Sequence, residues 1–189
     1  TVAIYKKIIG PTYYSFNIGK VHYVVLDDIE CTNSGAGDRS YNTKIVDEQI
    51  EWLRKDLQFV SSETPVVLAM HSPVYNESGV NRLANSGKVI EVLSGRKVHI
   101  MTGHTHIMYN VDNLSESDTG HYEHNSGAVC ATWWWSGYEV PGIHISTDGT
   151  PGGYRVFDVE GTEFEWVYKG TGKDESYQFR TYDRNEIHM

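Results

Sequence analysis

The stretch Pro65–Pro73, PVVLAMHSP, decides the fold of this 189-residue chain. Its first six residues form a continuous apolar run, which is typical of a short strand buried on both faces. Another short strand is predicted further along the chain, over Lys97–Thr102 (KVHIMT). Between the two strands, Val80–Leu93 has the pattern of a helix and is followed by Ser94-Gly95. Strand, helix and strand in this order predict an α/β core with a crossover connection.

The segments on the N-terminal side extend this core into a mixed sheet with flanking helices. Aromatic and β-branched residues on both sides of a glycine turn predict a hairpin of Tyr13–Ile18 and His22–Leu26. Apolar residues at helical spacing predict an amphipathic helix over Asp47–Val60. The polar segment Glu30–Tyr41, rich in Gly, Ser and Asn, predicts a loop.

After Ile107 the sequence changes to a β-rich pattern. Glycines separate short runs of aromatic and β-branched residues, which indicate strands. The clearest of these runs are Tyr154–Phe157, Phe164–Tyr168 and Tyr177–Tyr182.

The composition is that of an acidic globular chain. Sixteen basic and 25 acidic side chains give a formal charge of −9, which argues against binding to a nucleic-acid backbone or to anionic lipid. No window approaches the roughly 20 apolar residues of a membrane-spanning helix, and Thr1–Lys7 lacks the apolar core of a signal peptide. Cys31 and Cys130 are too few and too far apart for a disulfide scaffold or a zinc ribbon.

Histidines follow both buried strands. His71 comes directly after the first, and the sequence Gly103-His104-Thr105-His106 comes after the second. Ligands of open α/β sheets bind at the carboxyl ends of the strands, so we expect His71, His104 and His106 to reach one rim. Imidazole is the commonest metal ligand in proteins, and this clustering predicts a metal site. The alternative is that these histidines cap strand ends through hydrogen bonds.

Four other histidines are weaker candidates. His121 and His124 lie close together in a polar segment, where they could support a metal ligand from behind or touch a substrate. His22 and His99 lie inside strand patterns, and we expect both to be structural.

Three further features have a functional and a structural interpretation. Asp28, with Asp27, ends a predicted strand and could bind metal, although a solvated turn acid is the commoner case. Ser72 is no convincing nucleophile, because the elbow motif G-x-S-x-G is absent. Trp133–Trp135 could stack on a sugar or a base, but at most two of the rings share one face of a strand, which favours core or interface packing.

Several segments together resemble the calcineurin-like metallophosphoesterases. Val66–Pro73 and Gly103–His106 are similar to the last two metal motifs of that family, and Gln49–Leu57 is similar to the helix before them. Four more segments resemble a bacterial branch, common in gut-dwelling Bacteroides-type bacteria, that carries an extra β-domain on each side of the catalytic domain. These segments are Gly10–Phe16, Trp133–Gly137, Asp148–Tyr154 and Tyr168–Gly172.

The resemblance implies a division of the chain. Residues 1–147 would form the second half of the α/β-sandwich catalytic domain, and residues 148–189 the start of the C-terminal β-domain. The family motifs D-x-H, G-D-x-x-D and G-N-H, which supply carboxylate and asparagine ligands, do not occur in the sequence. We therefore expect a fragment that is inactive alone, with a partial or empty metal site. We also expect an uncovered sheet edge through which copies could associate.

The resemblance also implies the chemistry of the parent protein. It would be a phosphoric ester hydrolase that uses two divalent ions, zinc, iron or manganese, to activate a water molecule against phosphate mono- or diesters. His71 and His104 would ligate one ion and His106 the other. Because the branch often carries an export signal, a periplasmic or cell-surface location is expected.

Two other interpretations remain open. The β-rich region and its tryptophans fit a module that binds a glycan or a protein without catalysis; its fluorescence would respond to ligand but not to chelator. Alternatively, His71, His104, His106 and Asp28 could form the single zinc site of a hydrolase, which predicts one tightly bound ion and activity in this chain.

Overall fold

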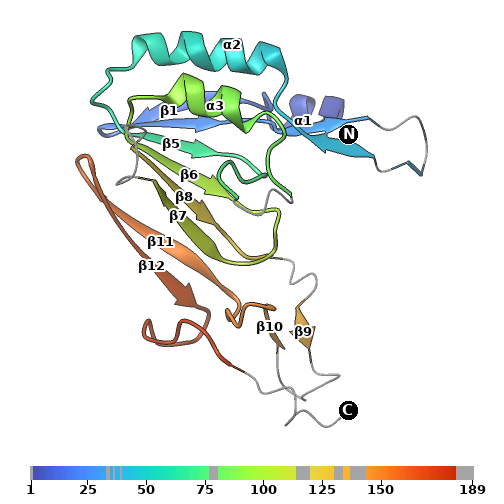
Figure 1. The fold of residues 1–189 in the computed structure, drawn as a ribbon, viewed down its shortest axis with the longest axis vertical. Coiled ribbons are helices and arrows are strands. Elements are labelled where there is room, and N and C mark those ends of the chain that lie inside the picture. Colours follow the sequence, from blue (N-terminus) through green and yellow to red (C-terminus); the bar gives the residue numbers. More distant parts are fainter. Residues whose placement is uncertain are drawn as a thin grey trace. The chain divides into compact units, whose positions relative to one another are not determined.

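The computed structural model describes residues 2–32, 35, 37–38, 40–76, 81–113, 120–129, 134–136 and 144–181. Its central element is a six-stranded sheet in the order β1-β2-β5-β6-β8-β7 (Figure 1). The strands are β1 (Tyr14–Ile18), β2 (Val21–Val25), β5 (Val66–Ala69), β6 (Val98–Thr102), β7 (Tyr109–Asn113) and β8 (His121–Asn125).

Three neighbouring strands of this sheet run parallel. His22 of β2 pairs with Val66 of β5, which in turn pairs with Val98 of β6. β1 adds to β2 as an antiparallel hairpin, in which Phe16 lies opposite Tyr23. The predicted hairpin and both buried strands are therefore present, and the predicted fold class, a mixed sheet with flanking helices, is confirmed.

Two helices cover one face of the sheet (Figure 1). They are α2 (Asp47–Asp56) and α3 (Ser86–Leu93). Their apolar sides pack on the parallel strands because those strands have no polar face to offer water. The core contains, among others, Val24, Ile50, Leu53, Leu68, Val89, Leu93 and Ile100.

The helix predicted over Asp47–Val60 is interrupted before its end. α2 stops at Asp56, and a single 3₁₀ turn, η1 (Leu57–Phe59), follows. Arg96 accounts for the change, because its guanidinium donates hydrogen bonds to the carbonyl oxygens of Leu57 at 2.8 Å and Val60 at 3.0 Å. These carbonyls are satisfied from outside the helix, so the regular α-helical ladder is not needed there.

The second predicted helix, Val80–Leu93, was wrong at its N-terminal side. Residue 80 lies outside the described residues, and residues 81–85 are not helical. The side-chain amide of Asn85 accepts a hydrogen bond from the Ile45 N–H and donates one to the Ile45 carbonyl. The Ala84 N–H also donates to the Thr43 carbonyl, at 2.8 Å. These bonds tie the segment to the chain before α2 and delay the helix until Ser86.

Two elements near the N-terminus were not predicted. α1 (Val2–Ile8) has seven residues, fewer than the roughly 11–18 over which helical periodicity can be recognised, and none of them is buried. The loop predicted over residues 30–41 is bordered by a small hairpin, in which β3 (Ile29–Cys31) pairs antiparallel with β4 (Tyr41–Thr43). Three-residue strands are too short for their alternation to be recognised in a sequence.

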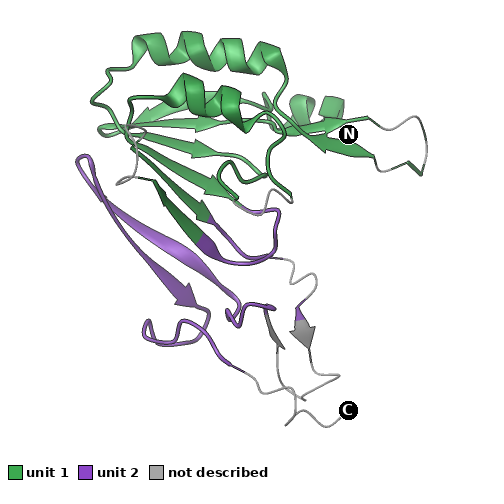
Figure 2. Ribbon diagram, in the orientation of Figure 1, with its two compact units in different colours: residues 1–102, 110–124 green, residues 103–109, 125–189 purple. Residues whose placement is uncertain are grey.

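The chain divides into two compact units (Figure 2). The first contains residues 1–102 and 110–124, and the second contains residues 103–109 and 125–189. The expected domain boundary at residues 147 and 148 stays a prediction.

The second unit contains two antiparallel strand pairs. β11 (Gly153–Glu160) and β12 (Glu163–Gly170) form a long hairpin, and β9 (Trp135–Ser136) pairs with β10 (His144–Ile145). The strand predicted over Tyr177–Tyr182 is wrong for residues 177–181, and residue 182 lies outside the described residues. Asp174 redirects the chain there, since it accepts hydrogen bonds from Ser176 through its side chain and from Tyr177 through its carbonyl.

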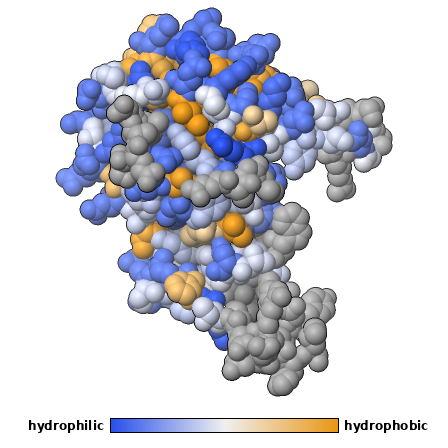
Figure 3. Space-filling view, in the orientation of Figure 1, coloured by the Kyte–Doolittle hydropathy of each residue, from blue (hydrophilic) through white to orange (hydrophobic). Residues whose placement is uncertain are grey.

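β1 lies at one edge of the six-stranded sheet, and three of its apolar side chains are exposed. These are Tyr14, Phe16 and Ile18. Association of copies through this edge stays a prediction. On the face shown in Figure 3, apolar residues appear as separate spots among hydrophilic ones. Within the described part of the chain, no helix has the length and apolar character needed to cross a membrane.

The core of α2 offers a direct test of this packing. Leu53 is fully buried, whereas Phe59 on η1 is 90% exposed. We expect Leu53→Ala to lower the free energy of unfolding by about 2–5 kcal/mol, because it leaves a cavity in a close-packed core. Phe59→Ala is the matched control and should change it by less than about 0.5 kcal/mol. Urea unfolding followed by circular dichroism measures both, and equal effects would contradict the packing described.

Candidate functional site

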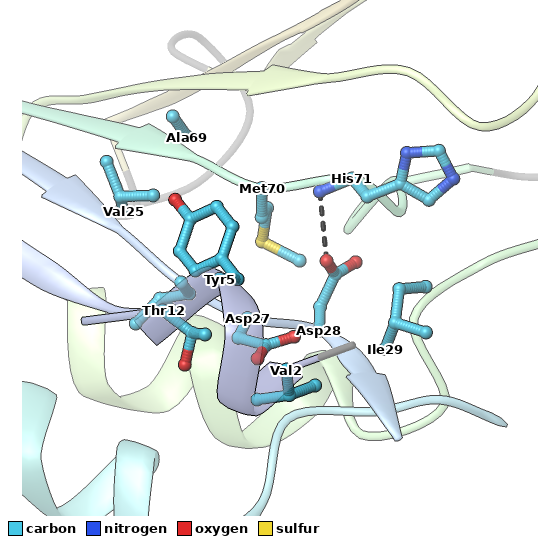
Figure 4. A pocket seen from close by; sticks show the side chains of 11 residues that line it. Val2, Tyr5, Thr12, Val25, Asp27, Asp28, Ile29, Ala69, Met70 and His71 are labelled. Carbon is cyan, nitrogen blue, oxygen red and sulfur yellow. Dashed lines mark hydrogen bonds between the residues drawn. The ribbon is translucent and has the colours of Figure 1, made fainter. Parts of the chain in front are cut away.

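His71 and Asp28 are joined at the carboxyl ends of β5 and β2. The two strands are parallel neighbours, so the residues that follow them emerge at the same edge of the sheet. The Asp28 carboxylate accepts a hydrogen bond from the backbone N–H of His71 at 3.0 Å (Figure 4). It accepts another from the backbone N–H of Ser72 at 2.5 Å. Asp28 is only 2% exposed. The expectation of a solvated turn acid is therefore wrong: this carboxylate fixes the backbone that carries His71.

The turn that carries Asp28 is itself held by α2. The Gln49 side chain accepts a hydrogen bond from the Asp27 N–H at 3.0 Å and donates one to the Asp27 carbonyl at 2.8 Å. Gln49 is buried although it is polar. Both hydrogen-bonding groups of the Asp27 backbone are thus satisfied, which sets the direction in which the next residue, Asp28, leaves the strand.

A pocket of about 750 Å³ opens beside this pair (Figure 4). Its polar end is formed by Asp27, Asp28 and His71, and α1 contributes Val2 and Tyr5 to its wall. In the close view the His71 imidazole extends away from Tyr5. The remaining lining residues are Thr12, Val25, Leu26, Ile29, Ala69 and Met70. The carboxyl ends of β2 and β5 therefore border a cavity, as expected for a ligand site in an α/β sheet.

The turn Gly103–Ile107, called the histidine turn below, has an unusual backbone. His104 has φ of 64° and His106 has φ of 62°, both in the left-handed region. A bond of 2.7 Å from the Thr105 N–H to the Gly103 carbonyl closes a three-residue turn around His104. Non-glycine residues in this region cost on the order of 1 kcal/mol each. Such a conformation persists only where surrounding contacts determine it, and it often marks a functional site.

Those contacts come from residues later in the chain. Asn125 is fully buried, and its side-chain amide donates to the Thr105 hydroxyl at 2.6 Å and to the Ile107 carbonyl at 2.8 Å. The Asp148 carboxylate accepts from the Met108 N–H at 2.5 Å. Burial raises the pKa of Asp148, but hydrogen bonds from the backbone of Met108 and Thr150 outweigh it, so the pKa lies below its ordinary value. Neither residue was singled out from the sequence alone, because nothing in their local pattern points to the turn.

The structure places the predicted metal ligands in two units. His71 belongs to the first unit, and His104 and His106 belong to the second. Among the described residues, no three of the His, Cys, Asp and Glu side chains gather where they could hold a metal ion. A shared role of these three histidines stays a prediction.

His121 is fully buried in the first unit, where it links two segments. Its Nε2 lies 3.2 Å from the Leu93 carbonyl at the end of α3, and its Nδ1 lies 2.6 Å from the Tyr75 hydroxyl. A carbonyl only accepts, so Nε2 carries the proton and Nδ1 accepts from the tyrosine. Burial lowers the pKa of His121, which favours this neutral form.

His124 pairs with His99 in the same unit. The His99 Nδ1 and the His124 Nε2 are 3.1 Å apart, and both side chains are buried. His99 is structural in this sense, as expected from its strand pattern. Burial, with a smaller effect of Lys97, lowers the pKa of His99 to about 4. The suggested roles of His121 and His124 beside a metal or a substrate stay predictions.

Glu123 is a buried carboxylate that the sequence analysis missed. It is fully buried and accepts hydrogen bonds from the Val74 N–H at 2.9 Å, the Tyr75 N–H at 2.6 Å and the Thr102 hydroxyl at 2.7 Å. Burial raises its pKa, while these hydrogen bonds act in the opposite direction. Its burial could not be anticipated, because the surrounding segment Gly120–Asn125 is polar in sequence.

Residues 123–189 match the family model described as the C-terminal of calcineurin-like phosphoesterase. The resemblance to the calcineurin-like phosphoesterases is confirmed. Asn125 and Asp148, which hold the histidine turn, both lie inside the matched range. A search of curated proteins finds no significant match.

The fold has a counterpart among solved structures. A dimetal phosphatase from Danio rerio is 16% identical to this chain, with a TM-score of 0.50 over 61% of the chain. The match covers 49% of that phosphatase, so this chain spans about half of its length. At this identity the similarity establishes the calcineurin-like phosphatase fold and no more.

Removal of the Asp28 carboxylate is expected to destabilise the fold. Asp28→Ala would leave the backbone N–H groups of His71 and Ser72 without their acceptor, and Ser72 is fully buried. We expect the free energy of unfolding to fall by about 2–4 kcal/mol. Asp28→Asn keeps one acceptor oxygen and should cost about half as much. Asp158→Ala, at an exposed position of β11, is the control; an Asp28→Ala effect no larger than this control would contradict the assignment.

The lowered pKa of His99 predicts a pH-dependent stability. Between pH 6.5 and 4 the unfolded chain binds a proton at His99 that the folded chain does not. The contribution of neutral His99 to the free energy of unfolding is therefore fully present above pH 6.5. It is lost as the pH falls towards 4, which lowers the free energy of unfolding by up to about 3 kcal/mol. His99→Gln removes this titration and should flatten the difference in unfolding free energy between pH 7 and pH 4.5. An unchanged pH dependence in the variant would contradict the burial of a neutral His99.

Proposed function

We propose that this chain is the histidine-bearing part of a metal-dependent phosphoesterase that hydrolyses phosphate mono- or diesters. The match of residues 123–189 to the C-terminal region of calcineurin-like phosphoesterases is the observation that supports it most directly. The placement of His71 after β5 and of the histidine turn after β6 agrees with that role. A phosphoester substrate and a periplasmic or cell-surface location are parts of the same proposal.

The proposed metal ligands are His71, His104 and His106. Two divalent ions held in such a centre activate a water molecule and polarise the phosphate oxygens. Neutral imidazoles bring no negative charge to offset the positive charge of the two ions, so carboxylate ligands are needed as well. The motifs D-x-H, G-D-x-x-D and G-N-H, which carry such ligands, are absent from these 189 residues. We therefore propose that the chain alone binds metal weakly and is not a competent hydrolase.

Metal content and turnover test this proposal together. The purified 189-residue chain should retain well under one ion after gel filtration and should not hydrolyse bis-(p-nitrophenyl) phosphate. The full-length natural protein should hydrolyse it, and His104→Ala in that protein should lower turnover by at least about 100-fold, since even residues behind a metal ligand cost about 10–100-fold. Asp158→Ala serves as the control. Near-normal turnover of the His104→Ala protein would overturn the assignment.

A further inference from the structure

We infer that Asp148 is a positioning residue for His104 and His106, acting through the backbone of the Gly103–Met108 segment. The inference deepens the proposed function and rests on it for its catalytic meaning. Its structural part rests on contacts within the second unit alone. The segment Asp148–Tyr154, one of those that resemble the bacterial branch, contributes no candidate ligand, and this role accounts for its presence beside the histidine turn.

Asp148 connects the histidine turn to the segment that follows β10. Its Oδ2 accepts from the Met108 N–H at 2.5 Å, and its Oδ1 accepts from the Thr150 N–H at 2.8 Å. The Met108 N–H is only two residues beyond His106, so this bond fixes the point at which the chain leaves the turn. A carboxylate that accepts two backbone hydrogen bonds on separate oxygens allows little change of orientation.

The carboxylate is itself held in place. Ser146 and Thr150 are joined by a bond from the Ser146 N–H to the Thr150 carbonyl at 3.0 Å, and the Gly149 N–H donates to the Ser146 carbonyl at 2.9 Å. Gly149 has φ of +84°, and an added Cβ there would lie 2.4 Å from the Arg180 carbonyl oxygen. Only glycine fits this tight turn, which explains the Asp-Gly pair at its centre. The Ser146 hydroxyl also lies 3.4 Å from the His106 carbonyl, to which it donates.

Asn125 holds the other side of the same turn. Its amide reaches Thr105 and Ile107, on both sides of His106. Arg155 connects this support to β11, because its guanidinium donates to the carbonyl oxygens of Asn125 at 2.9 Å and Tyr109 at 3.3 Å. The two left-handed histidines therefore lie between two sets of hydrogen bonds, and the Asp148 carboxylate is the anionic member of those sets.

The test uses the 189-residue chain and needs no metal. Asp148→Asn is nearly isosteric and leaves one acceptor for two N–H donors. We expect the Met108 amide to exchange with deuterium at least about tenfold faster, and the ring ¹H–¹³C signals of His104 and His106 to shift or to multiply. Asp158→Asn, at an exposed position in the same unit, should change neither. Unchanged Met108 exchange and unchanged ring signals in Asp148→Asn would overturn the inference.

Two further measurements separate positioning from loss of fold and from loss of function. Amide exchange in the β11–β12 hairpin should stay at the wild-type level in Asp148→Asn; if it accelerates together with Met108, the residue is merely structural and the inference fails. In the full-length protein, Asp148→Asn should lower kcat about tenfold with little change of KM. If that protein hydrolyses no phosphoester, the proposed function fails, whereas the Met108 and histidine signals still decide the structural inference.

Discussion

The parallel pairing of β2, β5 and β6 is the constraint on which the rest of the first unit depends. It buries both faces of the central strands, and it requires α2 and α3 to cover one of them. It also brings the ends of neighbouring strands to one edge, so that Asp28 after β2 meets the backbone of His71 after β5. The apolar core and the polar contacts at its rim therefore have the same origin.

The sequence predicted this framework well because apolar runs are local signals. The run Pro65–Met70 has no polar side chain and can hardly be placed at a surface, so both the strand and the position of His71 could be anticipated. The resemblance to the calcineurin-like phosphoesterases was recognised from motifs such as Gly103–His106. In contrast, Asp28 was interpreted as a solvated acid, since no pattern in one strand shows which backbone groups another strand will present to it.

The elements that escaped prediction share a physical cause. The end of α2 is set by Arg96, which lies after α3, and the start of α3 is set by Asn85 bonding to Ile45. α1 is only seven residues long. All of these features lie beyond local apolar periodicity, because the two helix ends depend on hydrogen bonds between distant segments and α1 is too short to show a period.

The histidine turn shows how the segment matched by the family model supports residues that precede it in the chain. Two non-glycine residues with positive φ cannot hold their conformation from within a five-residue turn, because each favours another region of backbone space. Asn125 and Asp148 supply the missing constraint, and both lie in the segment that matches the family's C-terminal region. A protein that shares the histidine motif but lacks this segment would have the same imidazoles without the backbone that orients them. On this reasoning, the C-terminal segment and the histidine turn form one structural element.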